Sequence, residues 1–307
     1  MLAGWPRTRR LEFMKLSKTN FLIYRDCPHN AWVKLHRPEV YRANPLSAFD
    51  QNIIETGNEV DELARGLFPG GVIVEHNDFE RTSQLIAAQQ TVIYQAAFAA
   101  NRFVIACDIL VWNSGTNAYD LYEVKASTSG DDKKSNDDLY TYDLAFQTVV
   151  LRDVGVPLGR QYLVRLNSDY VRGERLDLDE LFTREDFTER VKVVVATMPT
   201  EMATAYDVLQ RDTPLPSPCG CIYRGRSAQC TTFEFSNPQV PEYSVHDIAR
   251  IGNSKTRLNA LIERGIVAIT DVPDDPTEAG LSDKRWNQVR AAKSLRAYVD
   301  QQAIGRC

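Results

Sequence analysis

Apolar residues recur every three or four positions over several stretches of the chain, a period that predicts amphipathic helices. Two short helices are expected, the first starting near Leu16-Ser17-Lys18 and both meeting at Cys27-Pro28, where the proline interrupts the pattern. Longer helices are expected at 46–66, 80–98, 138–154 and, for the most part, 184–210.

Shorter apolar segments are typical of strands and are bounded by turn residues. They lie at 72–74, 103–112, 119–126 and 161–166. The second and third are separated by a Ser-Gly-Thr turn, so we expect a hairpin, and a polar loop should follow at 127–136. The order helix, strand, helix, strand, strand, helix, strand indicates an α/β fold with a mixed central sheet flanked by helices.

Prolines at positions 214, 216 and 218 interrupt the pattern and are followed by a cluster of cysteines. We interpret 14–240 as one domain that includes this cluster and 241–307 as a small helical unit. Residues 1–13 are expected to be a disordered extension, because a regular pattern begins only at Met14.

The chain has 307 residues and a net charge of −5, so its overall charge does not indicate electrostatic binding of nucleic acid. Residues 1–40 nevertheless carry +5, which fits either a local DNA-binding face or a solvated basic end. No apolar run is long enough for a membrane helix, so no membrane partner is expected.

The Arg9-Arg10 pair is typical of a twin-arginine export signal, but Lys15 and Lys18 interrupt the apolar stretch that such a signal requires. A cytoplasmic location is therefore expected. Disulfides are disfavoured there, and metal ligation becomes the competing use of the six cysteines.

The predicted hairpin carries the residues with the clearest chemistry. Asp108 lies in its first strand, and Glu123 and Lys125 share one face of the second. Buried carboxylates need a partner, and carboxylates are the oxygen ligands that Mg²⁺ or Mn²⁺ prefers. The same three residues also fit a surface hairpin with a simple Lys–Glu pair.

The C-terminal part contains two helical patterns separated by a short glycine turn, around Ile251-Gly252 and Arg264-Gly265. Such a unit is similar to a helix–hairpin–helix, which contacts DNA phosphates. Lys255 and Arg257 are candidate DNA contacts here, as is Lys18 in the basic first part of the chain. A small packing bundle explains the pattern equally well.

With these residues in place, the chain resembles the RecB-like branch of the PD-(D/E)XK nucleases that carry an iron–sulfur staple, including the CRISPR-adaptation exonucleases. It is also similar to a bacterial family of unassigned function that contains this domain. The resemblance spans about 14–300 and rests on Leu16 to Phe21, Tyr24-x-x-Cys27-Pro28, Trp32, Ala106 to Val111, Tyr122 to Thr128 and Asp143 to Gln147.

The resemblance implies a restriction-endonuclease-like core in which Asp108 and Glu123 hold Mg²⁺ or Mn²⁺ and Lys125 is the catalytic lysine. Gln147 matches the glutamine of the following helix, although the tyrosine expected four residues later is Leu151. A further ligand is expected from the helix at 46–66, where a histidine is replaced by Asp61, with Glu59 and Glu62 as alternatives. An acidic, solvated helix face accounts for these three equally well.

The resemblance further implies a structural 4Fe-4S cluster on one early and three late cysteines, namely Cys27, Cys219, Cys221 and Cys230. Zinc and a ligand-free loop are the alternatives, because the Cys-Gly-Cys spacing is short for a metal motif.

We therefore predict a Mg²⁺- or Mn²⁺-dependent deoxyribonuclease acting on single-stranded ends, with DNA and a repair or defence protein as partners. A catalytically inactive DNA-binding module with the same fold is the first alternative. A metal-stabilised interaction protein without a DNA role is the second.

Overall fold

The computed structural model describes residues 14–42, 48–128, 133–253 and 255–296, without the side chains of residues 48–50, 133–136, 253 and 255. Within this range the chain forms two compact units. The first contains the described residues up to Asp26 and those from 48 to Asp212, and the second contains those from Cys27 to 42 and from Thr213 onward. The expected extension 1–13 lies outside the described residues.

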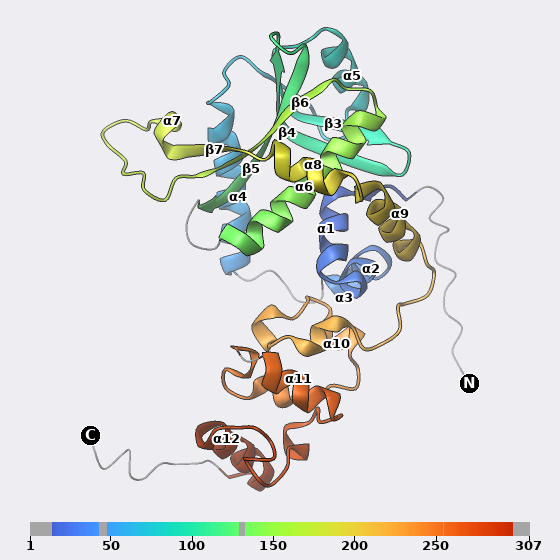
Figure 1. Ribbon diagram of the computed structural model, residues 1–307, viewed down its shortest axis with the longest axis vertical. Helices are drawn as coiled ribbons and strands as arrows, with labels where there is room; N and C mark the ends of the chain where they lie inside the picture. Colours follow the sequence, from blue (N-terminus) through green and yellow to red (C-terminus); the bar gives the residue numbers. More distant parts are fainter. Residues whose placement is uncertain (1–13, 43–47, 129–132, 254, 297–307) are drawn as a thin grey trace. The chain divides into compact units, whose positions relative to one another are not determined.

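The first unit is a mixed α/β structure (Figure 1). Its strands are β1 (Leu16–Ser17), β2 (Val72–Ile73), β3 (Val92–Ala100), β4 (Phe103–Asn113), β5 (Ala118–Thr128), β6 (Leu158–Leu166) and β7 (Phe182–Asp186). Its helices are α1 (Lys18–Asp26), α4 (Ala48–Arg65), α5 (Phe79–Ala87), α6 (Lys133–Asp153), α7 (Leu178–Leu181), α8 (Thr188–Val195) and α9 (Met198–Leu209).

The described strands form one sheet in the order β2-β3-β4-β5-β6-β7, and β1 pairs with β4. The β3–β4, β4–β5 and β6–β7 pairs are antiparallel, whereas the β2–β3, β5–β6 and β1–β4 pairs are parallel. This confirms the predicted α/β class with a mixed central sheet flanked by helices.

Helices lie on both faces of the sheet. On one face, Val60 and Ala64 of α4 pack against Ile109 of β4 and Val124 of β5. Helix α6 covers the opposite face, where it contacts β3, β4 and β6 as well as α1, α8 and α9. It ends as expected before Gly155, whose φ of +77° is the left-handed conformation that glycine adopts without a steric cost.

The predicted helix at 80–98 is wrong in its second half. Helix α5 ends at Ala87, and Val92–Ala100 is strand β3, which pairs with β4 along nearly its whole length. The alanine-rich sequence suits a helix, but pairing with a central strand outweighs that weak preference. The helical prediction for 184–210 is confirmed by α8 and α9, although its first residues belong to strand β7.

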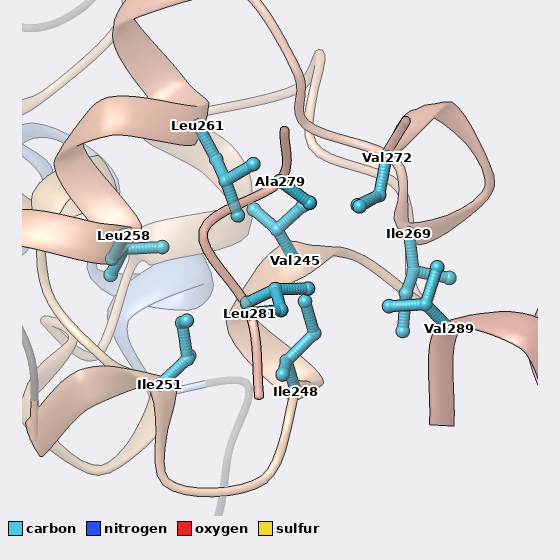
Figure 2. Close-up of a cluster of buried hydrophobic side chains, with 10 residues drawn as sticks. All are labelled: Val245, Ile248, Ile251, Leu258, Leu261, Ile269, Val272, Ala279, Leu281 and Val289. Atoms are coloured by element: carbon cyan, nitrogen blue, oxygen red, sulfur yellow. The ribbon is translucent and has the colours of Figure 1, made fainter. Parts of the chain in front are cut away.

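The second unit is helical. It contains α2 (Pro28–His36), α3 (Pro38–Tyr41), α10 (Phe233–Ser236), α11 (Lys255–Glu263) and α12 (Asp283–Ser294). Short 3-10 turns lie at Gly220–Tyr223, Arg226–Ala228, Val245–Asp247, Ile251–Asn253 and Ile269–Asp271. Between residues 245 and 289 this unit has a hydrophobic cluster of its own (Figure 2), made by Val245, Ile248, Ile251, Leu258, Leu261, Ile269, Val272, Ala279, Leu281 and Val289.

No described helix is both long enough and apolar enough to cross a membrane.

Candidate active site and candidate metal centre

The β4–β5 hairpin brings two carboxylates together. Ile109 pairs with Tyr122 in the antiparallel ladder, so one step further along the register Asp108 lies opposite Glu123. Opposed residues share a face of the sheet, and this face is the one covered by α6. Asp108 also accepts a hydrogen bond of 2.9 Å from the backbone N–H of Val124, which fixes one of its oxygens.

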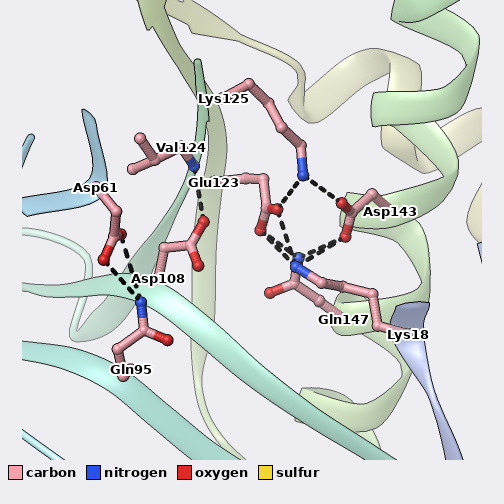
Figure 3. A network of polar contacts seen from close by, with 9 residues as sticks. All are labelled: Lys18, Asp61, Gln95, Asp108, Glu123, Val124, Lys125, Asp143 and Gln147. Atoms are coloured by element: carbon pink, nitrogen blue, oxygen red, sulfur yellow. Dashed lines mark hydrogen bonds and ion pairs between the residues drawn. The ribbon is translucent and has the colours of Figure 1, made fainter. Parts of the chain in front are cut away.

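Glu123 lies at the centre of a network of charged and polar groups (Figure 3). Lys18 Nζ is 2.9 Å from both of its oxygens, and Lys125 Nζ is 2.5 Å from Oε1. The same two ammonium groups reach Asp143 on α6, at 3.1 Å and 2.8 Å. The Gln147 amide donates to Glu123 at 2.7 Å and to Asp143 at 3.0 Å.

These contacts give the two carboxyl groups of the hairpin different pKa values. Burial, followed by the charge of Glu123, raises the pKa of Asp108 from 3.8 to about 7. Burial acts in the same direction on Glu123, but the ammonium groups of Lys125 and Lys18 hold the pKa of that carboxyl well below its usual range. Divergent pKa values in adjacent carboxyl groups are typical of functional sites.

The carboxylates of this network keep Lys18 and Lys125 charged. Burial alone would lower the pKa of Lys18 and of Lys125, but the carboxylates of Asp143 and Glu123 raise the pKa of both above its ordinary value. Glu123 and Asp143 are each 1% exposed, so these ion pairs compensate two deeply buried negative charges.

The donor set suits a divalent cation. Asp108 is partly exposed, so an ion can reach the pair that it forms with Glu123, and carboxylate oxygens are the ligands that Mg²⁺ and Mn²⁺ prefer. Gln147 Oε1 is buried and finds no hydrogen-bond donor among the described residues. A further polar group at this point would satisfy that orphaned oxygen.

Asp61 of α4, the expected further metal ligand, is hydrogen-bonded and ion-paired to residues outside the network around Glu123. Its carboxylate accepts from the Gln95 amide at 3.2 Å and pairs with Arg65 one helical turn away. Gln95 lies in β3 opposite Asp108 of β4, between the regular pairs Tyr94–Ile109 and Ala96–Cys107, and has a φ of +54°. A left-handed residue other than glycine inside a strand costs about 1–3 kcal/mol, and such strain is concentrated at functional sites.

The remaining candidate residues are spread over both units. Glu59 and Glu62 lie exposed on α4. Arg257 is exposed on α11, whereas the side chain of Lys255 lies outside the described residues. Lys18, a candidate DNA contact, lies in the charged network around Glu123.

In the second unit, the four predicted cysteines come together. Cys27, Cys219, Cys221 and Cys230 are all buried, and their sulfur atoms lie within 4.8 Å of one another. Cys27 is the N-cap residue directly before α2. Cys221 lies in the 3-10 turn Gly220–Tyr223, directly after Cys219, and Cys230 lies in the loop before α10. This is a candidate metal centre, and soft thiolates in a closed cluster suit zinc or iron.

The thiols of this cluster influence one another's ionisation. Hydrogen bonds from its neighbours, Cys221 first among them, lower the pKa of Cys219, whereas hydrogen bonds to Cys219 raise the pKa of Cys27 and of Cys230. Cys219 therefore ionises while Cys27 and Cys230 stay protonated. A bound cation would allow all four thiols to ionise.

Sequence reasoning missed three residues of these sites. Asp143 was not a candidate, although it lies four residues before Gln147 and therefore on the same helical face, a spacing that could have indicated it. Gln95 carried no signal in the sequence. Asn237, which donates to Cys219 Sγ at 3.1 Å, could be found only once the cysteines were placed.

No protein-family model and no curated protein matches the sequence. Among solved structures, an alkaline exonuclease from Laribacter hongkongensis is similar with a TM-score of 0.37 and 14% identity, over 64% of this chain and 88% of that protein. A protein named SSO0001 is similar with a TM-score of 0.36 and 13% identity, over 67% of this chain and 81% of that one.

Proposed function

We propose that this chain is a Mg²⁺- or Mn²⁺-dependent deoxyribonuclease of the PD-(D/E)XK type with a RecB-like, restriction-endonuclease-like core. The observation that carries the proposal is the convergence of Asp108, Glu123, Lys125 and Gln147 on one face of the β4–β5 hairpin. Two carboxylates, an ammonium group and an orienting amide are the parts that metal-assisted phosphodiester hydrolysis requires.

Each residue has a distinct part in this proposal. Asp108 and Glu123 hold the divalent ion, which supplies Lewis-acid chemistry and a more acidic bound water. Lys125 places a positive charge beside the position where negative charge develops on the phosphate. Gln147 fixes the orientation of Glu123 through its amide, and Asp61 and Glu59 on α4 remain candidates for a further ligand.

The finer features of the proposal concern the substrate. We expect cleavage of DNA from single-stranded ends in the cytoplasm, together with a protein partner in repair or defence. Lys255 and Arg257 on α11 are proposed phosphate contacts, which would make DNA binding decrease as salt increases.

A catalytically inactive DNA-binding module is the second candidate. Leu151, which stands at the position of the expected tyrosine, is fully buried, so that position serves the hydrophobic core. Glu123 is also already held by two ammonium groups with which a divalent ion would have to compete.

The deciding experiment is a cleavage assay on end-labelled single- and double-stranded DNA with Mg²⁺ or Mn²⁺. Glu123→Gln and Lys125→Met are each expected to lower the rate by about 100-fold or more. Glu80→Gln on the exposed side of α5 is the matched control and should retain full activity. Unchanged cleavage by Glu123→Gln contradicts the proposal. DNA binding without metal-dependent turnover in the unaltered protein favours the binding module.

A further inference from the structure

The spacing of the four sulfur atoms limits what the cysteine cluster can hold. No two of the sulfurs of Cys27, Cys219, Cys221 and Cys230 are more than 4.8 Å apart. In a regular tetrahedron with edges of that length, the centre lies about 2.9 Å from each corner. A single ion bound by four thiolates at about 2.3 Å needs edges of about 3.8 Å, which this spacing accommodates.

A 4Fe-4S cluster requires a wider site. Each cysteine then binds its own iron atom, and the four irons are themselves separated by the width of the cluster. The sulfurs must lie at the corners of a correspondingly larger tetrahedron. Four sulfurs within 4.8 Å of one another do not leave room for four irons and four sulfides between them.

The backbone holds these sulfurs in place. The side-chain amide of Asn237 accepts from the Cys219 N–H and donates to the Cys219 sulfur, both at 3.1 Å. The Cys27 carbonyl accepts the N–H of Ala31 at the start of α2, and the Cys230 carbonyl accepts that of Phe233 at the start of α10. The close approach of the sulfurs is therefore fixed by turns and caps on both sides of the cluster.

We propose that these four cysteines bind a single zinc ion in a closed tetrahedral site and do not hold an iron–sulfur cluster. Four thiolates that are all buried form the kind of site in which zinc has a structural role and no open coordination position. The proposal concerns the second unit alone and does not depend on whether the first unit cleaves DNA.

The zinc site would have a definite structural effect. Cys27 belongs to the segment that forms α2 and α3, and the other three cysteines belong to the segment that begins at Thr213. Within the second unit, these segments are otherwise joined by contacts such as the 3.0 Å hydrogen bond from Thr232 to Asn30. Removing zinc should therefore separate them and unfold this unit first, because binding energy at such sites is folding energy.

The first test is the metal content of the full chain, purified anaerobically from cells supplied with both iron and zinc. The expected result is one zinc atom per chain, no acid-labile sulfide and no brown colour. Four irons with sulfide overturn the proposal, and so does a single iron without sulfide.

The second test uses Co²⁺ as a spectroscopic probe on the full chain after removal of its metal. The charge-transfer bands of tetrahedral cobalt thiolate should saturate at one equivalent and disappear when zinc is added. A metal-free chain that shows no such bands when Co²⁺ is added contradicts the proposal.

A pair of variants links the metal to the cluster. Cys221→Ser should lose the zinc, whereas Cys107→Ala, which removes a buried cysteine of β4 in the other unit, should retain it. Retention of one zinc by Cys221→Ser places the metal elsewhere and overturns the assignment. If that variant does not fold, the cobalt titration of the unaltered chain still decides the question.

Discussion

Lys18 Nζ lies 2.9 Å from both carboxylate oxygens of Glu123, a residue 105 positions further along the chain. Lys125 reaches the same carboxylate from its own strand. Glu123 thus has two ammonium partners, and Asp143 provides a second acceptor for both of them. A divalent ion that binds Glu123 must therefore compete with lysines that can remain paired to Asp143.

Lys18→Met should destabilise the first unit and increase its response to divalent metal. Removing one partner of a buried ion pair costs about 3–5 kcal/mol, because a buried carboxylate is left partly uncompensated. Mg²⁺ or Mn²⁺ should restore part of that loss, so the metal-induced rise in Tm should be larger for the variant than for the unaltered protein. Differential scanning fluorimetry with and without metal measures both effects.

Lys15→Met provides the control for that substitution. Lys15 lies three residues earlier, is exposed and contacts the Phe79 ring, so its loss should change the Tm little and leave the response to metal unchanged. Equal metal responses in Lys18→Met and the unaltered chain would show that Lys18 does not compete with the ion.

Asp143→Asn should lower kcat by about 100-fold with little change in KM. The neutral amide is similar in shape, but it loses the ion pairs that position the ammonium groups of Lys18 and Lys125 between Asp143 and Glu123, and small misplacements of catalytic groups have effects of this size. The loss should be confined to the rate, with an unchanged circular dichroism spectrum. Asp153→Asn, at the exposed end of the same helix, is the comparison, and equal activities of the two variants would rule out a positioning role for Asp143.

Asn237→Ala should weaken metal binding in the cysteine cluster by about 10- to 100-fold, the usual effect of removing a group that orients a ligand. The asparagine is fully buried and makes hydrogen bonds to both the backbone and the sulfur of Cys219. Competition with a chromophoric chelator measures the change. Ser227→Ala, at an exposed site in the 3-10 turn Arg226–Ala228 between Cys221 and Cys230, should behave like the unaltered chain.

His246 should make the second unit less stable below pH 6.5. Burial lowers its pKa from 6.5, and nearby Arg226 acts in the same direction, whereas the hydrogen bond to Ile222 and the charge of Asp247 oppose the change. The unfolded chain therefore binds a proton at a higher pH than the folded one. The stabilisation is complete above 6.5 and is lost as the pH falls from there through the folded pKa.

The hydrogen bonds of His246 fix the tautomer of its neutral ring. Its Nε2 lies 2.7 Å from the Ile222 carbonyl and must donate, so Nδ1 accepts from Ser244. His246→Gln should flatten the change in unfolding free energy between pH 7.5 and 5.5, as followed by urea titrations. A variant with the same pH slope as the unaltered protein would assign that slope to other groups.

The sequence predicted the hairpin and its face because strand alternation is local. Asp108, Glu123 and Lys125 lie on the two strands of one hairpin, so their relation follows from period and register alone. Strand β3 was missed because its alanines suit a helix, and only pairing with β4 makes it extended. That pairing also places Gln95 opposite Asp108, a relation that no local pattern contains.

The partners of the site were harder to predict than its centre. Lys18 reaches Glu123 only because Leu16–Ser17 pairs with β4, which brings the first turn of α1 to the hairpin. The grouping of Cys27 with three cysteines nearly 200 residues later came from a resemblance, and the spacing of their sulfurs came only from three-dimensional geometry.

Each of the two units is built from two separate segments of the chain, and this limits how one unit can be exchanged without the other during evolution. The backbone passes from one unit to the other after Asp26, returns after position 44, and leaves again after Asp212. No single cut separates the units, because any fragment ending near Asp212 keeps Cys27 and loses the three later cysteines. A gene exchange that replaced the second unit would have to replace two distant stretches together, so the two units are expected to evolve as a pair.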